Sequence, residues 1–307
     1  RNPMPEIEIV DMAREFGGGS RSMFSTKLSQ ALHDALAQGR KAVLLLNQRG
    51  FAQFLLCRNC GFVPTCPHCS TSLTYHERGS KLVCHHCGYT VTAPARCPSC
   101  GSPYLKRFGA GTQRVESELQ SIVDSWTLSD GKSMNVRVIR MDADTTSKKD
   151  AHKQLLEQFA APGPAVLLGT QMIAKGLDFD DVTLVGVVNA DTQLRLPDFR
   201  AGERTFDLIE QVAGRAGRAQ LPGKVIVQTY CAGAAPIQAA AHYDRAFFLK
   251  DELPKRKALG YPPYVRLADI RVWGKDEAVV CEEANALYRA IRKQIDEQTG
   301  PDWTLFP

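Results

Sequence analysis

The sequence has no segment suited to crossing a membrane and no apolar stretch near its start. No run approaches the roughly 18 apolar residues that a membrane helix needs. The opening residues, Arg1-Asn2-Pro3, do not lead into the apolar core of an export signal. We therefore expect a cytoplasmic protein that keeps its thiols reduced and is not bound to a membrane.

A phosphate-binding loop is also missing. The pattern Gly-x-x-x-x-Gly-Lys-Ser/Thr is approached at Gly131-Lys132-Ser133, but Trp126 occupies the position of the first glycine. An Asp-Glu-x-His box is absent as well. We therefore expect the chain alone not to hydrolyse ATP.

Charge of one sign does not dominate. The 307 residues carry 38 Lys and Arg against 33 Asp and Glu, which gives a formal net charge of +5. This mild excess permits a nucleic-acid partner without arguing for one, since only a clustered basic face would make that case. The length and the apolar share of 44% suit two domains, or one domain with an insertion.

Cysteine, by contrast, is concentrated in one segment. Two cysteines at Cys-x-x-Cys spacing can direct both sulfurs at one tetrahedral ion, so each pair is half of a four-cysteine zinc site. Cys231 and Cys281 stand apart, and we expect them to be buried as small apolar residues. The pairs are Cys57/Cys60, Cys66/Cys69, Cys84/Cys87 and Cys97/Cys100.

The four pairs could combine in two ways. Joining neighbours is possible, but only five residues separate Cys60 from Cys66. We favour nesting, in which a hairpin over residues 73–83 brings two pairs together and the outer pairs close its base. The nested sites are a base group of Cys57, Cys60, Cys97 and Cys100, and a hairpin group of Cys66, Cys69, Cys84 and Cys87. Nesting also joins the two ends of the segment, as an insertion in a larger domain requires.

Other interpretations of this segment remain open. A disulfide framework fits the spacing less well than metal binding does. The side chains of His68, His85 and His86 could replace a thiolate, although eight thiolates already complete two sites. A site closed by four thiolates lacks the open position of catalytic zinc, so the ions would be structural. Four aromatic residues could form a small core or stack on unpaired bases; they are Phe51, Phe54, Phe62 and Tyr75.

Around this segment, strands alternate with helices. A helix beginning at Ser25 or Thr26 and ending at Gly39 is followed by a continuously apolar strand over 41–47. Short loops between such elements imply right-handed crossovers and a parallel sheet with helices on both faces. The other expected strands are 7–10, 136–140, 165–169, 182–188 and 225–229, and the other expected helices lie around 115–123, 148–159 and 203–214.

The composition changes after residue 235. One long helix is expected from Ile237 to about Leu259, where Tyr261-Pro262-Pro263-Tyr264 would end it. A strand over 267–273 and a helix over 275–295 would begin a small α+β unit that looks incomplete. Because residue 1 is also not methionine, we expect an excised fragment.

Two further segments carry candidate chemistry. Thr170, Gln171 and Lys175 follow a buried strand and are donors suited to phosphates. In Gln-Val-Ala-Gly-Arg-Ala-Gly-Arg, which starts at Gln211, Arg215 and Arg218 are three residues apart and face the same way. Guanidinium groups bind phosphate oxygens bidentately and stabilise charge on a transferring phosphoryl group.

These segments resemble motifs V and VI of superfamily 2 helicases. Motif V is matched by Gly-Thr-Gln-Met-x-x-Lys-Gly-x-Asp-Phe from Gly169, and motif VI by the segment from Gln211. With four cysteine pairs inserted after Leu46-Asn-Gln-Arg-Gly-Phe, the chain resembles the PriA family of replication-restart helicases over almost its whole length. The resemblance implies a RecA-like second lobe (1–56 and 104–235), a zinc-binding insertion (57–103), and a linker helix with a partial C-terminal domain (236–307).

The same resemblance implies roles for single residues. Arg215 and Arg218 would approach the ATP phosphates, one of them as an arginine finger, although a salt-bridge role is the alternative. Gln211, Gly176 and Asp178 would lie at the nucleotide cleft, although Asp178 could instead cap a turn. The residues that would contact DNA are Thr170, Gln171, Lys175, Asn47 and Arg49.

For the whole protein, the resemblance implies an ATP-dependent 3′-to-5′ DNA helicase that uses ATP with Mg²⁺ and carries two Zn²⁺. It would recognise stalled forks and start primosome assembly in the bacterial cytoplasm, at the nucleoid. Its partners would be forked and single-stranded DNA, primosome proteins, the machinery that loads the replicative helicase, and single-stranded DNA-binding protein. The first lobe is missing, so the fragment would be inactive. A non-enzymatic restart scaffold with a degenerate motor is the alternative.

Overall fold

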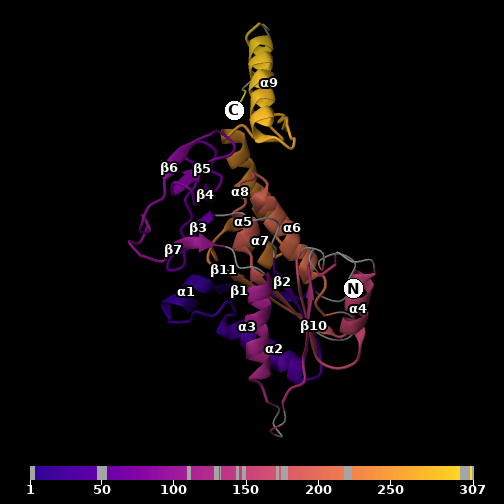
Figure 1. The fold of residues 1–307 in the computed structure, drawn as a ribbon. Coiled ribbons are helices and arrows are strands. Elements are labelled where there is room, and N and C mark those ends of the chain that lie inside the picture. The colour runs from indigo at the N-terminus through magenta and orange to yellow at the C-terminus, as the bar shows by residue number, and fades with distance from the viewer. Residues whose placement is uncertain are drawn as a thin grey trace.

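The computed structural model shows a parallel-sheet lobe, a cysteine-rich module beside it and a long C-terminal helix that projects away (Figure 1). It describes residues 4–46, 54–108, 112–127, 131, 133–142, 145–146, 150–170, 173, 179–217, 223–297 and 305.

All strands of the central sheet run parallel. Their order across the six-stranded sheet is β1-β11-β10-β2-β9-β8. Strand β2 therefore lies in the interior of the sheet, although it precedes the cysteine segment and both of its neighbours follow that segment. The strands are β1 (Glu6–Asp11), β2 (Lys41–Leu46), β8 (Arg137–Met141), β9 (Ala165–Gly169), β10 (Val182–Asn189) and β11 (Lys224–Thr229). The expected α/β class is confirmed, and each of the six strands expected in this sheet differs from the observed one by no more than one residue at either end.

Helices cover both faces of this sheet. Along β2, Ala42, Leu44 and Leu46 face one apolar core, and Val43 and Leu45 face the other. This alternation is what a strand covered on both sides requires. The first core is completed by α1 (Met12–Gly17), α2 (Thr26–Ala37) and α3 (Thr112–Asp124). The second is completed by α4 (Ala151–Ala160), α6 (Ala201–Ala213), α7 (Ala235–Ala241) and α8 (Arg245–Ala258), and the short α5 (Asp191–Leu194) follows β10.

Helix α2 illustrates how the sequence sets these elements. The Leu28 N–H donates to the Ser25 hydroxyl oxygen at 3.1 Å, which caps the helix. Leu28, Leu32 and Leu36 recur every four residues and are buried against the sheet. At Gly39 the backbone takes φ +72°, and the helix has ended, as expected.

The cysteine-rich module contains two small antiparallel sheets. Strand β3 (Phe54–Cys57) pairs with β7 (Leu105–Phe108) where the chain enters and leaves the module. Strands β4 (Thr74–His76), β5 (Lys81–Val83) and β6 (Thr90–Thr92) form a three-stranded sheet. The hairpin expected over 73–83 is therefore present, whereas β6 was not expected.

Two secondary-structure expectations for the C-terminal part are wrong. The long helix over 237–259 is two helices, because Tyr243 takes φ +54° and the Asp244 carboxylate then caps α8 by accepting from the Phe247 N–H at 2.8 Å. The strand expected over 267–273 does not form. Its alternating sequence has no described strand beside it to share a ladder, and Trp273 is 85% exposed.

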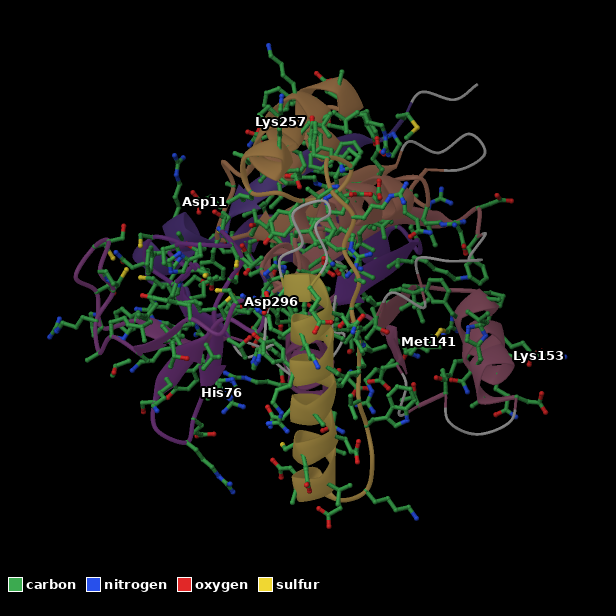
Figure 2. The ribbon with its side chains drawn as sticks, turned by 90° about the horizontal axis from the view of Figure 1, so that it is seen from above. Asp11, His76, Met141, Lys153, Lys257 and Asp296 are labelled. Atoms are coloured by element: carbon green, nitrogen blue, oxygen red, sulfur yellow. The ribbon has the colours of Figure 1, made fainter. Side chains whose placement is uncertain are left out.

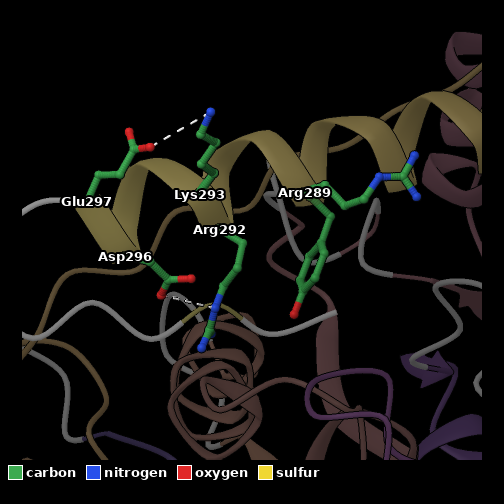
Figure 3. A pocket seen from close by; sticks show the side chains of 6 residues that line it. Arg289, Arg292, Lys293, Asp296 and Glu297 are labelled. Atoms are coloured by element: carbon green, nitrogen blue, oxygen red, sulfur yellow. Dashed lines mark ion pairs between the residues drawn. The ribbon is translucent and has the colours of Figure 1, made fainter.

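Helix α9 (Glu277–Glu297) forms as expected, but none of its residues is buried. Cys281 on this helix is exposed, which corrects the expectation that it is a core residue. Figure 3 shows a charged surface of α9 where Arg292 pairs with Asp296 at 3.4 Å and Lys293 with Glu297 at 3.8 Å. Among the helices formed by described residues, none has the length and apolarity needed to cross a membrane.

Candidate metal centres

The structure assembles the eight paired cysteines into two groups of four. The base group joins the first and last pairs, and the hairpin group joins the two inner pairs. Within each group the sulfur atoms all lie within 4.8 Å of one another. This is the nested arrangement, not the joining of neighbours. Figure 2 shows the module to one side of the lobe, with His76 near the end of its hairpin.

The distances between sulfur atoms fit a tetrahedral ion. In the base group, Cys57 and Cys100 are 3.6 Å apart, as are Cys60 and Cys97. In the hairpin group, the sulfurs of Cys66 and Cys87 are also 3.6 Å apart. Zinc–sulfur bonds of about 2.3 Å in a tetrahedron place sulfurs about 3.8 Å apart, whereas a disulfide needs about 2.05 Å. All ten cysteines are free, so the structure does not support the disulfide framework.

Each pair is held in the same tight turn. The residue after the second cysteine donates its N–H to the carbonyl of the first cysteine at 2.8 to 2.9 Å, and has a positive φ between 54° and 76°. The N–H of the first cysteine donates to the carbonyl five residues later, also at 2.8 to 2.9 Å. The residues with positive φ are Gly61, Ser70, Gly88 and Gly101. These four residues were not predicted as part of the sites, although a glycine or serine after every pair is a visible signal.

One thiol in each group ionises easily. Burial raises the pKa of Cys84, but the backbone N–H groups of Cys87 and His86 outweigh it and bring the pKa to about 7. A backbone hydrogen bond from Ser102 lowers the pKa of Cys100, also to about 7. Burial raises the pKa of Cys60 to about 12 and raises that of Cys66 as well. Each group thus offers a thiolate at neutral pH, which suits a cation.

Histidine does not complete either group among the described residues. The Nε2 atoms of His76 and His85 are 3.1 Å apart, and the His68 ring contacts Tyr89. His86 approaches a sulfur, with its Nδ1 atom 3.4 Å from Cys69 Sγ. The candidate ligand set is therefore eight thiolates.

The module also contains an apolar core of its own. Phe62 and Tyr75 pack beside the cysteines and Leu82, whereas Phe54, which is 2% exposed, packs with Leu56 and Val63 against Tyr230 of the lobe. These contacts favour the core interpretation of the aromatic residues over base stacking. Phe51 lies outside the described residues.

The base of the module is packed against the lobe at Gly61. A Cβ atom there would lie 2.1 Å from the Tyr230 carbonyl oxygen, so only glycine fits. The Cys231 thiol, which is half-buried, donates to the Gly61 carbonyl at 3.5 Å. Asp191 holds this end of β11 by accepting from the Tyr230 N–H at 2.7 Å. Burial raises the pKa of Asp191, as expected for a carboxyl enclosed in the core.

Of the expected phosphate ligands, Arg215 is described. It follows the end of α6 and is half-buried, in a turn where the Gly217 N–H donates to the Val182 carbonyl at 3.1 Å. A Cβ atom on Gly223 would lie 2.3 Å from the backbone of Gly217, so this turn is tightly enclosed. Arg215 therefore lies near the amino end of β10, and Gln211 is exposed on the last turn of α6.

Thr170 lies at the opposite, carboxyl end of the parallel strands. It follows the carboxyl end of β9, where its N–H donates to the Met141 carbonyl at 3.4 Å. The candidate DNA and nucleotide residues that the structure describes thus lie at opposite ends of the parallel strands, Thr170 at the carboxyl ends and Arg215 at the amino ends. The remaining candidates lie outside the described residues; they are Asn47, Arg49, Gln171, Lys175, Gly176, Asp178 and Arg218.

Comparison with protein families gives two matches. Residues 66–91 match the family described as "PriA DNA helicase Cys-rich region (CRR) domain", which includes all four cysteines of the hairpin group. Residues 111–220 match "Helicase conserved C-terminal domain". Among solved structures, "Mss116p DEAD-box helicase domain 2 bound to an RNA duplex" aligns over 94% of this chain and 74% of its own at 12% identity, with a TM-score of 0.34.

Curated relatives match almost the whole chain. "Replication restart protein PriA" of Bacillus subtilis (strain 168) is 47% identical over 96% of this chain and 36% of its own length. The protein of the same name from Synechocystis sp. is 43% identical over 92% of this chain and 34% of its own. The protein of the same name from Chlamydia muridarum is 37% identical over 96% of this chain and 38% of its own length. Over the stretch that it spans, about a third of their length, the chain belongs to the PriA family of replication restart proteins.

Proposed function

We propose that the chain is the second motor lobe and zinc module of an ATP-dependent 3′-to-5′ DNA helicase that acts at stalled forks. The observation that carries this proposal is the insertion of two four-cysteine groups into a helicase C-terminal lobe, between β2 and α3. The curated relatives that match the chain are named as replication restart proteins. The domain boundaries expected from the sequence, at 57–103 and 236, are part of the same proposal.

Zinc is the ion that we propose for both groups. Four thiolates per group match its preference for sulfur and its tetrahedral geometry. Bound zinc would supply a crosslink between distant pairs of the chain, without an open position for catalysis. The base group would join β3 and β7, and the hairpin group would secure β4 to β6. The module would thus meet fork DNA and primosome proteins as a rigid unit.

For nucleotide binding, we propose the side of the sheet at the amino ends of the strands, where Arg215 lies. Arg215 and Arg218 would contact the phosphates of ATP held with Mg²⁺ against a first motor lobe, and Gln211, Gly176 and Asp178 would help to orient the nucleotide. The enclosed turn at Gly217 supports this role, because it leaves the Arg215 backbone little freedom. A fixed guanidinium can stabilise charge without reorganising during the reaction.

For DNA binding, we propose the opposite side of the sheet, at the carboxyl ends of the strands. Thr170 and, by sequence, Gln171 and Lys175 follow β9, and Asn47 and Arg49 follow its neighbour β2. Donors to phosphate oxygens recognise nucleic acid by shape and charge, so binding would depend on fork structure and salt rather than on sequence. Further partners would be single-stranded DNA-binding protein and the machinery that loads the replicative helicase, in a bacterial cytoplasm at the nucleoid.

The test is ATP hydrolysis by the full-length protein with and without forked DNA. We expect turnover that rises when the fork is added. Fork binding without turnover would overturn the motor proposal and favour a restart scaffold with a degenerate motor. The same assay on residues 1–307 alone should give no turnover, because the phosphate-binding loop is absent from this sequence.

A further inference from the structure

A second contact joins the module to the lobe, far from Gly61 in the sequence. Tyr261 follows α8 and is only 4% exposed, although it lies in the segment that leads to α9. Its hydroxyl donates to the Cys69 carbonyl at 3.1 Å. Its ring contacts the edge of His86, with centroids 5.7 Å apart. Tyr261 thus touches both Cys-x-x-Cys turns of the hairpin group, one at a ligand and one beside a ligand.

The Tyr261 ring is also anchored to the lobe. It stacks on Phe199 with centroids 4.9 Å apart and planes inclined by 9°. The guanidinium of Arg256 lies 5.3 Å from the Phe199 ring and pairs with Glu203 of α6 at 2.8 Å. The Tyr261 N–H donates to the Arg256 carbonyl at 2.8 Å, which ties the residue back to α8.

The hydrogen bond is made to the carbonyl of a proposed metal ligand and not to its sulfur. Tyr261 can therefore restrain the Cys69 backbone without competing with an ion for the thiolate. This geometry suits a residue that positions a metal site from outside.

We propose that Tyr261 is a positioning residue that couples the hairpin group to the lobe and to the segment after α8. The inference rests on the proposed zinc in that group. A bound ion orders the two turns that Tyr261 contacts, and a docked Tyr261 slows the opening of those turns and the loss of the ion. Because such coupling is reciprocal, metal in the hairpin group also holds the segment around Tyr261 in place.

The experiment compares Tyr261→Phe with Tyr264→Phe in the full-length protein. Tyr264 lies in the same segment and is 47% exposed, so its substitution makes the same chemical change without a buried partner. Metal release to a coloured chelator is followed after zinc content has been measured. We expect one of two zinc ions to leave the Tyr261→Phe protein roughly three to ten times faster, as the loss of one hydrogen bond predicts. The other ion should leave at the unaltered rate, and the Tyr264→Phe protein should match the unaltered one.

A second readout reports the reverse direction of the coupling. Trypsin cleavage after Arg266, just beyond the contact, should be faster in metal-loaded Tyr261→Phe than in Tyr264→Phe. Tyr261→Ala, which also removes the stacked ring, should give larger effects in both assays. Release and cleavage rates equal to those of the unaltered protein in both Tyr261 variants would overturn this inference alone. Fewer than two zinc ions in the unaltered protein would overturn the zinc proposal and the inference with it.

Discussion

At the scale of single residues, the position after each cysteine pair sets the turn of the backbone, and at Gly61 it also forms a docking contact. Its positive φ lets the chain fold back so that both sulfurs of the pair face one point. At Gly61 the same position also forms the contact with Tyr230, whereas at Gly101 nothing lies within 4 Å of a Cβ atom. The two glycines have φ of +74° and +69°, so they differ in contact and hardly in conformation.

This pair of glycines allows a matched test of the docking contact. Gly101→Ala adds only the penalty of a left-handed alanine, about 1 kcal/mol, and should lower Tm by roughly 2–4 °C. Gly61→Ala adds the same penalty and a clash with a backbone oxygen, so we expect at least twice that shift. Thermal unfolding of the zinc-loaded proteins gives the comparison. Equal shifts for the two variants would contradict the docking contact at Gly61.

Arg215 and Arg218 provide a second test at this scale. In the full-length protein, Arg215→Ala or Arg218→Ala, whichever removes the proposed arginine finger, should lower DNA-stimulated ATP turnover by roughly 10³-fold, because charge on the transferring phosphoryl group loses its partner. Fork binding should change far less than turnover. Arg14→Ala is the control, since the Arg14 side chain is 89% exposed on α1. Turnover within about tenfold of the unaltered protein for both variants would exclude an arginine finger in this pair.

At the scale of elements, the module divides into two parts that each hold one cysteine group. Strands β3 and β7 close the base, where Cys57 is the last residue of β3 and pairs with Leu105. In the hairpin group, one cysteine pair precedes β4 and the other lies between β5 and β6. No cysteine belongs to both groups, so each site has its own ligands and its own small sheet.

Separate ligand sets predict separate metal loss. Cys66→Ser should reduce zinc from about two ions per chain to about one and leave the base group filled. Cys281→Ser should keep both ions, because Cys281 is exposed on α9 and belongs to neither group. Metal analysis of the purified proteins tests both outcomes. Loss of both ions in Cys66→Ser would show that the two groups depend on each other.

Elements set by local sequence were predicted, and those set by a distant partner were not. Helix α2 has its cap, its leucines and its terminal glycine within one short stretch, so its ends were predicted closely. The helix expected over 237–259 failed at Tyr243, where a left-handed residue that no local pattern reveals separates two helices. The alternating residues 267–273 predicted a strand, but a strand needs a neighbour that its own sequence does not specify.

The candidate site was predictable to a similar extent. The nested groups followed from loop length and from the hairpin, which are local properties. The docking of the module did not, because Gly61 with Tyr230 and Tyr261 with Cys69 are contacts between residues far apart in the chain. Cys231 was expected to be a plain core residue, yet its sulfur accepts from Arg195 at 2.9 Å and contacts the module.

At the scale of the whole molecule, the module interrupts the chain without interrupting the sheet. Strand β2 comes before the module and pairs with β10 and β9, which come after it. Strand β1 likewise pairs with β11 near the end of the lobe. The two cores of the lobe contain none of the grouped cysteines, whereas the core of the module consists largely of them. Apolar packing therefore stabilises the lobe, whereas the module would depend on the proposed metal ions.

This division predicts what happens when zinc is removed. A strong chelator should unfold residues 57–103, and a protease should then cut within that segment. The two pieces should stay together, because β1 and β2 from the first piece are paired with strands of the second. The lobe should keep its helical circular dichroism and unfold within a few degrees of the intact protein. Zinc-loaded protein under the same protease is the control and should resist cutting there. Separation of the pieces, or collapse of the lobe together with the module, would mean that the ions stabilise the sheet as well, through the contacts at Gly61 and Tyr261.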